Sequence, residues 1–132
     1  LFIRALHNLN RTEEELGTYT ATIAETYRIL KPGGVVGVVQ HRASEDTPDA
    51  WADGNAGYLK TSFVVDSFEA AGFVLEESSE INSNPADDAG EGDIVWRLAP
   101  SFATTEEGTP EREAIAKIGE SDRMTLRFRK PE

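Results

Sequence analysis

The turn Lys31–Gly34, with the sequence Lys-Pro-Gly-Gly, constrains the fold of this chain more than any other short segment. Pro32 cannot continue a helix, and one of the two glycines can supply the left-handed residue that ends it. The turn therefore separates a helix from Val35–Val39, a run that is almost wholly apolar. Such a run is typical of a parallel strand that is covered on both faces. The pattern predicts a strand that ends at His41, at the sheet edge where α/β proteins bind ligands.

The segment before this turn has the pattern of a strand followed by a helix. Leu1–Leu6 predicts a short buried strand, and His7–Asn10 predicts the loop at its carboxyl end. Thr12–Glu15 has the capping-box spacing that starts a helix. One apolar helix face is then predicted from Leu16, Tyr19, Ile23, Tyr27 and Leu30. Together with the strand after the turn, these elements predict one right-handed βαβ unit.

The remainder of the chain predicts two more helices and two more strands. Thr61–Ala71 has a helical pattern, and Thr109 is placed to cap a short helix that opens at Pro110. Strands are expected at Phe73–Ile81 and around Met124–Phe128. These two strands fit an antiparallel pair that closes one edge of a mostly parallel sheet. The predicted fold class is therefore α/β.

Composition excludes several kinds of partner. At 132 residues the chain fits one small domain with a real hydrophobic core. Its formal net charge of −11 argues against nucleic acid or an anionic membrane as the main partner. Because the chain has no cysteine, disulfides, thiolate metal sites and a cysteine nucleophile are excluded. No apolar run approaches the length of a membrane span.

The first residues, Leu1–Leu6, lie inside an apolar run and have no initiator methionine before them. We therefore expect a fragment of a longer protein whose N-terminal part is absent. The missing signal peptide is then uninformative, so a cytoplasmic protein is favoured and an exported bacterial protein stays open. A sheet edge left without its neighbouring strand is expected to favour self-association.

A set of short motifs follows in order along the chain. They are Leu6-His7-Asn8-Leu9, Leu30-Lys31-Pro32-Gly33-Gly34, His41-Arg42-Ala43, Gly57-Tyr58-Leu59-Lys60, Ala70-Ala71-Gly72-Phe73, Asn84-Pro85-Ala86-Asp87 and Ser121-Asp122-Arg123-Met124. This ordered set resembles the C-terminal half of a class I S-adenosylmethionine-dependent methyltransferase, and more narrowly one bacterial group of predicted methyltransferases. The resemblance covers most of the chain. It implies a Rossmann-like fold, S-adenosylmethionine as methyl donor and a small molecule as acceptor.

One part of the family's pattern has no match in this chain. The glycine-rich loop that cradles the methionine part of the cofactor is missing, and so is the acidic residue that holds the ribose hydroxyls. Gly33 and Gly34 precede a strand and do not open a helix, so they are no substitute. This chain alone is therefore expected to lack most of the cofactor site and to be inactive.

The resemblance implies one cofactor-binding stretch within this chain. It places Ala5, Leu6, His7 and Asn8 where the family's fourth strand passes the cofactor. The alternative is an ordinary loop between a strand and a helix.

The two histidines, His7 and His41, are the candidate catalytic residues. Histidine can act as a general base near neutral pH, and an oxygen or nitrogen acceptor needs to lose a proton. Each histidine follows a predicted parallel strand, so both are expected to face one crevice. The alternative for each is that it caps its strand end by hydrogen-bonding nearby backbone.

Five further side chains are candidates for binding the acceptor: Arg42, Tyr58, Lys60, Asn84 and Asp87. The first three would suit an anionic or aromatic acceptor, and the alternative for them is a solvated loop. The role of the last two rests on the resemblance alone, because an Asn-Pro pair starts turns for local reasons. No metal site is expected, since the acidic residues between positions 87 and 93 lack the spacing of a calcium loop.

Two other functions stay open. One is a different nucleotide-dependent α/β enzyme, such as a dehydrogenase. The predicted closing antiparallel strand disfavours this alternative. The other is a non-catalytic Rossmann-like interaction domain that keeps the fold without the donor site.

Overall fold

Five strands and five helices make up the chain, and the computed structural model describes residues 1–132. The strands are β1 (Phe2–Ile3), β2 (Val35–Ala43), β3 (Leu59–Lys60), β4 (Val74–Ser79) and β5 (Arg123–Arg129). The helices are α1 (Leu6–Arg11), α2 (Glu13–Leu16), α3 (Thr18–Ile29), α4 (Thr61–Ala70) and α5 (Pro110–Ile118), with a short 3-10 turn η1 (Val95–Arg97).

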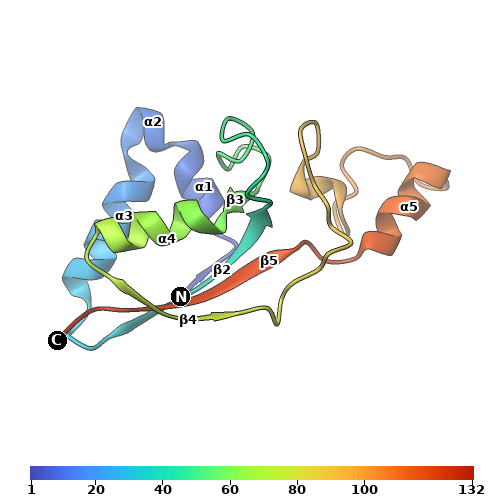
Figure 1. Ribbon diagram of the computed structural model, residues 1–132. Coiled ribbons are helices and arrows are strands. Elements are labelled where there is room, and N and C mark those ends of the chain that lie inside the picture. The colour runs from blue at the N-terminus through green and yellow to red at the C-terminus, as the bar shows by residue number, and fades with distance from the viewer.

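The strands form one mixed sheet in the order β1-β2-β5-β4, and β3 pairs with the end of β2. β1 runs parallel to β2, whereas β5 runs antiparallel to both β2 and β4. β1, β2 and β4 therefore share one direction, and β5 lies between β2 and β4 in the opposite direction (Figure 1). The α/β class is confirmed, but the sheet is mixed where we predicted a mostly parallel one. The antiparallel pair expected at one edge is present, with β4 outermost.

Helices α1 to α4 cover one face of the sheet, and the main hydrophobic core lies beneath them (Figure 1). Alternate side chains of β2 point into this core because successive residues of a strand face opposite sides. The aromatic rings of Phe68 in α4 and Phe128 in β5 stack with centroids 4.5 Å apart. The buried residues of the core are Leu6, Tyr19, Ile23, Val36, Val38, Leu59, Val64, Phe68, Phe73, Met124, Leu126 and Phe128.

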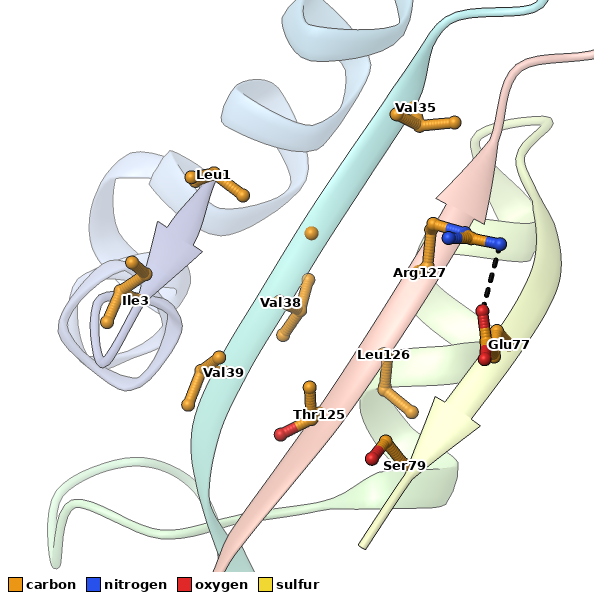
Figure 2. Close-up of a pocket in the computed structure, with 11 residues that line it drawn as sticks. Leu1, Ile3, Val35, Val38, Val39, Glu77, Ser79, Thr125, Leu126 and Arg127 are labelled. Carbon is orange, nitrogen blue, oxygen red and sulfur yellow. Dashed lines mark ion pairs between the residues drawn. The ribbon is translucent and has the colours of Figure 1, made fainter. Parts of the chain in front are cut away.

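The opposite face of the sheet carries no helix. Val35 is 47% exposed and Ile3 is 55% exposed on this side, so the expected cover on both faces of β2 was wrong. A hollow of about 410 Å³ lies across β1, β2, β5 and β4, and Figure 2 shows the side chains that line it. An ion pair of 2.9 Å between Arg127 and Glu77 lies on its β5–β4 side (Figure 2).

The first strand is shorter than the sequence predicted. Arg4 adopts a left-handed backbone with φ 52°, which ends β1 after Ile3. The expected strand Leu1–Leu6 was therefore wrong in its second half, and His7 lies in a helix instead of a loop. Helix α1 forms here because Leu6 and Leu9, three positions apart, both pack against the main core.

The single helix predicted before the Lys-Pro-Gly-Gly turn is two helices. Gly17 takes a left-handed φ of 64° and separates α2 from α3. Leu16 is consequently 70% exposed, although the spacing placed it on the buried face. Thr12 makes no capping hydrogen bond to α2. Instead, Glu13 caps α3, where its carboxylate accepts from the backbone N–H of Thr20 at 3.0 Å.

The later helices match the sequence pattern closely. α4 ends before Gly72, whose φ of 108° suits a helix stop. In α5 the hydroxyl of Thr109 accepts from the backbone N–H of Arg112 at 3.3 Å, and Pro110 holds the first helical position. A second, smaller core gathers at the carboxyl end of β2, away from the covering helices. Its buried members are Ala43, Ala52, Ala56, Tyr58, Ala89, Val95 and Leu98.

Candidate functional site

His7 in α1 lies beside His41, which is in β2 two residues before that strand ends at Ala43. The predicted strand end at His41 was therefore wrong. The register pairs Ile3 with Val39, so the chain that leaves β1 passes beside the last residues of β2, near the carboxyl edge of the sheet. The two imidazole rings lie with centroids 5.3 Å apart and a tilt of 54°. Both side chains are almost wholly buried, at 4% and 8% exposure. The structure therefore brings together the two candidate bases that the sequence separates by a helix and a turn.

His7 is held by Gln40, a residue that the sequence analysis did not single out. The backbone N–H of His7 donates to the Gln40 side-chain oxygen at 3.2 Å, and the ring Nδ1 lies 3.2 to 3.3 Å from the same amide group. The Gln40 amide also donates to the carbonyl of Gly57 at 3.0 Å. Gln40 is completely buried, so this network fixes His7 at the end of β2. The sequence feature that could have identified Gln40 is its polar amide side chain directly after the apolar run Val35–Val39.

His41 is held by a serine from the opposite end of the chain. Its Nδ1 lies 2.6 Å from the hydroxyl oxygen of Ser121. That oxygen also accepts from Nε of Arg123 at 2.9 Å. The Ser121 hydroxyl can donate to Nδ1 of neutral His41, and in that tautomer the imidazole proton is on Nε2.

Burial and positive neighbours keep both imidazoles neutral at pH 7. Burial, together with the charges of His7, Arg123 and Arg4, lowers the pKa of His41 to about 3. Burial also lowers the pKa of His7, against the hydrogen bond from Gln40, which raises it. His41 is therefore a weak proton acceptor, since a base works best with a pKa near the operating pH. His7 is the better placed of the two for that role.

A cavity of about 190 Å³ opens beside His41. Arg4 from the end of β1 and Arg123 from the start of β5 both line it, together with Ser121 and the indole of Trp96. The guanidinium of Arg11 lies over the same indole, 5.6 Å from the ring centroid. Two arginines thus line one small opening in a chain of net charge −11.

Arg42 is fully engaged in ion pairs within the chain. Its guanidinium donates to Asp122 and to Glu80, each at 2.9 Å. The hydrogen bonds with Asp122 and Glu80 raise the pKa of Arg42 above its usual value. These pairs join the end of β2 to the segment before β5 and to the end of β4.

Tyr58 and Asp87 lie in a buried network rather than on the surface. The hydroxyl of Tyr58 donates to the carboxylate of Asp87 at 2.9 Å, and Arg97 pairs with the same carboxylate at 2.7 Å. The Asp87 side chain is wholly buried and also accepts from the backbone N–H of Asp122 at 3.0 Å. Burial and the negative charge of Asp87 raise the pKa of Tyr58. The network therefore connects the second core to Asp122, the residue that precedes β5.

Lys60 and Asn84 also have partners within the chain. Lys60 pairs with the exposed carboxylate of Asp49 at 2.6 Å. The amide of Asn84 donates to the carbonyls of Ile118 and Glu120 at 2.8 Å and 2.6 Å, which shapes the turn between α5 and β5. Of the five residues expected to bind an acceptor, none lines the cavity beside His41.

The expected cofactor stretch is only partly accessible. Leu6 is completely buried in the main core and His7 nearly so, whereas Ala5 is half-buried and Asn8 is exposed. Ala5 and Asn8 can therefore contribute one wall of a binding site. Within the chain, no group of three or more acidic or histidine side chains is arranged to hold a metal ion.

None of the helices combines the length and apolar character that crossing a membrane requires. Comparison of the chain with models of known protein families, with curated proteins and with solved structures finds no match.

Proposed function

We propose that this chain forms the acceptor-binding part of a class I S-adenosylmethionine-dependent methyltransferase with a Rossmann-like sheet. The observation that carries the proposal is the strand order, in which β5 lies antiparallel between the parallel strands β2 and β4. A closing antiparallel strand is what the resemblance of the motifs implies. The meeting of His7 and His41 at the carboxyl ends of β1 and β2 supports the same reading, since α/β sheets bind their ligands at that edge.

In this proposal His7 removes a proton from a small-molecule acceptor and His41 helps to position it. Nε2 of His7 makes no hydrogen bond in the structure, and Gln40 holds the other side of the ring. His41 offers Nε2–H as a donor in the tautomer in which the Ser121 hydroxyl donates to its Nδ1. S-adenosylmethionine, when bound, would supply an electrophilic methyl group. Acceleration would then come largely from holding the acceptor in line with that group.

The residues present do not form a complete cofactor site. Ala5 and Asn8 offer one wall only, and no glycine-rich turn joins a strand to a helix within the chain. The remaining walls are assigned to the glycine-rich segment that the family has and this sequence lacks. The uncovered sheet face in Figure 2 agrees with a partner segment that packs there.

Calorimetric titration with S-adenosylmethionine tests the proposal on two proteins: this chain and the natural protein with any sequence that precedes it. We expect binding only by the longer protein, followed by methyl transfer from radiolabelled donor to a small-molecule extract. Absence of binding by both proteins would overturn the proposal.

The exposed apolar sheet face also favours a second function, that of a non-catalytic interaction domain. Ile3 and Val39 line a hollow of about 410 Å³ there, which is large enough for side chains of another protein. Such a domain would bind no S-adenosylmethionine in any length of chain, so the same titration separates the two functions.

A further inference from the structure

Four cations of this chain, Arg4, Arg11, Lys31 and Lys117, form neither an ion pair nor a side-chain hydrogen bond, and of these only Arg4 lines the cavity beside His41. Most other arginines pair with carboxylates, as Arg42, Arg97 and Arg127 do. The side chain of Arg4 makes no ion pair and no hydrogen bond, although the chain carries a net charge of −11. With so many carboxylates available, a cation left without one is a candidate for binding an anion from outside the chain.

The backbone holds Arg4 at the mouth of the cavity beside His41. Its N–H donates to the carbonyl of Val39 at 2.7 Å, and its φ of 52° is a conformation that side-chain-bearing residues rarely adopt. This left-handed residue turns the chain from β1 into α1. The position of Arg4 is therefore fixed by the fold, while its guanidinium stays available.

Two further groups in the cavity can donate to an anion. Arg123 comes from the start of β5, directly opposite His41 in the β2–β5 register. His41 offers Nε2–H when the Ser121 hydroxyl donates to its Nδ1. Guanidinium groups match the geometry of carboxylates and phosphates, and donors from three elements define a site more sharply than one surface cation does.

The size of the cavity and the ion pair of Arg123 with Glu120 limit which ligands can bind. A volume of about 190 Å³ is below the roughly 300–1,000 Å³ of pockets that enclose a drug-sized ligand, so one functional group enters rather than a whole molecule. Arg123 is paired with Glu120, whose side chain is 77% exposed. The Arg123 side chain is only 17% exposed, but the Glu120 carboxylate lies in solvent and can return to water when an incoming anion displaces it.

We propose that Arg4, Arg123 and His41 bind the oxyanion group, a carboxylate or a phosphate, of the methyl acceptor, and that Glu120 competes with it for Arg123. Calling this ligand the acceptor rests on the proposed methyltransferase function. The anion site itself does not depend on the donor. The acceptor class is therefore an anionic small molecule that presents its oxyanion to the arginines and its nucleophile to His7.

The test is a nuclear magnetic resonance titration of the 132-residue chain, without S-adenosylmethionine, that follows the imidazole and arginine side-chain signals. Inorganic phosphate and malonate are titrated separately against sodium chloride at matched ionic strength. We expect saturable shifts of the His41 and Arg4 signals with at least one oxyanion. A response to phosphate alone or to malonate alone identifies the group and supports the proposal.

Substitutions locate the site. Arg4→Gln is expected to weaken binding by about tenfold or more, which is typical of losing one charge-assisted hydrogen bond. Arg4→Gly removes the same charge and suits φ 52°, so it keeps the test valid if Arg4→Gln folds poorly. Glu120→Gln is expected to tighten binding severalfold. Lys31→Gln removes one positive charge at the opposite end of β2 and is expected to change binding less than twofold.

Two results would overturn the proposal. One is the absence of a saturable shift with either anion. The other is equal weakening by Arg4→Gln and Lys31→Gln, which indicates general electrostatic attraction. Because the titration contains no S-adenosylmethionine, its failure leaves the proposed reaction standing. Failure of donor binding in the longer protein would likewise leave a measured anion site intact.

Discussion

Nδ1 of His41 lies 2.6 Å from the hydroxyl oxygen of Ser121, a residue 80 positions further along the chain. This hydrogen bond joins the end of β2 to the residue two positions before β5. It fixes the orientation of the imidazole and decides which ring nitrogen faces a ligand. The state of His41 therefore depends on the correct docking of β5.

Acid should destabilise the protein through His41. The imidazole is neutral in both the folded and the unfolded chain above pH 6.5, so it adds no pH dependence there. Below pH 6.5 the unfolded chain gains a proton that the folded chain, with a pKa of about 3, does not. The free energy of unfolding should then fall by up to about 1.4 kcal/mol per pH unit from this residue. Urea unfolding of the parent chain and His41→Gln at pH 7.5 and pH 5 measures the difference.

Only the histidine variant should lose part of this acid sensitivity. Lys31→Gln serves as the control, because it lies at the other end of β2 and should retain the full drop. An identical drop in His41→Gln would show that carboxylates alone cause the acid sensitivity.

His7→Gln should reduce methyl transfer by the longer protein about 10²-fold or more, the lower end of what a positioned general base contributes. Binding of S-adenosylmethionine should stay nearly unchanged, because the substitution removes the base and not the donor site. Turnover is measured with radiolabelled donor, and donor binding by calorimetry. Unchanged turnover in this variant would remove His7 from the mechanism.

Asp87→Ala should cost about 3–5 kcal/mol of stability, because it removes the buried carboxylate of the pair and leaves Arg97 with only the more exposed Asp93 at 3.7 Å. Tyr58→Phe should cost less, about 1.5–3 kcal/mol, since it removes the hydrogen bonds of the hydroxyl with Asp87 and Arg97 but leaves the Asp87–Arg97 pair in place. Urea unfolding of both variants measures the two losses of unfolding free energy, and the loss in Asp87→Ala should be the larger. Similar losses in the two variants would mean that the ion pair is not the stabilising element of the network.

Gly57→Ala should destabilise the second core by about 2 kcal/mol or more, through backbone strain and overpacking. Gly57 has φ 93°, and a Cβ there would clash with Cγ1 of Val95. Gly92→Ala is the matched control, with φ 91° and no atom within 4 Å of its Cβ position. Its loss should be about 1 kcal/mol, from strain alone. Equal melting temperatures for the two variants would contradict the role of the close approach.

Local chemistry made much of the fold predictable. The Lys-Pro-Gly-Gly turn and the apolar run after it located β2, and Thr109 with Pro110 located α5, because turns and caps depend on neighbouring residues. Gly17 shows the limit of spacing alone. Its left-handed conformation rotates the helix after it, so Leu16 points to solvent despite its position in the repeat.

The surroundings of the histidines were less predictable than their position. The predicted parallel pairing of the two strands was enough to bring the histidines together, although His41 lies within β2 and does not follow it. Their hydrogen-bond partners depend on register between segments far apart in sequence, which no local pattern encodes. Ser121 reaches His41 only because β5 pairs antiparallel with β2, and Arg4 reaches the cavity only because β1 stops after two residues.

β5 is the last strand in the sequence but lies in the middle of the sheet, and this constrains the order in which the strands can pair. The central ladder closes a loop of some 80 residues, and pairings this distant are slow to form compared with helices. Until β5 docks, β4 has no strand to pair with and His41 has neither Ser121 nor Arg123 beside it. The imidazole should then titrate like that of a free peptide. The protonation state of His41 during refolding therefore reports when β5 docks. That single step both creates the anion site and completes the sheet.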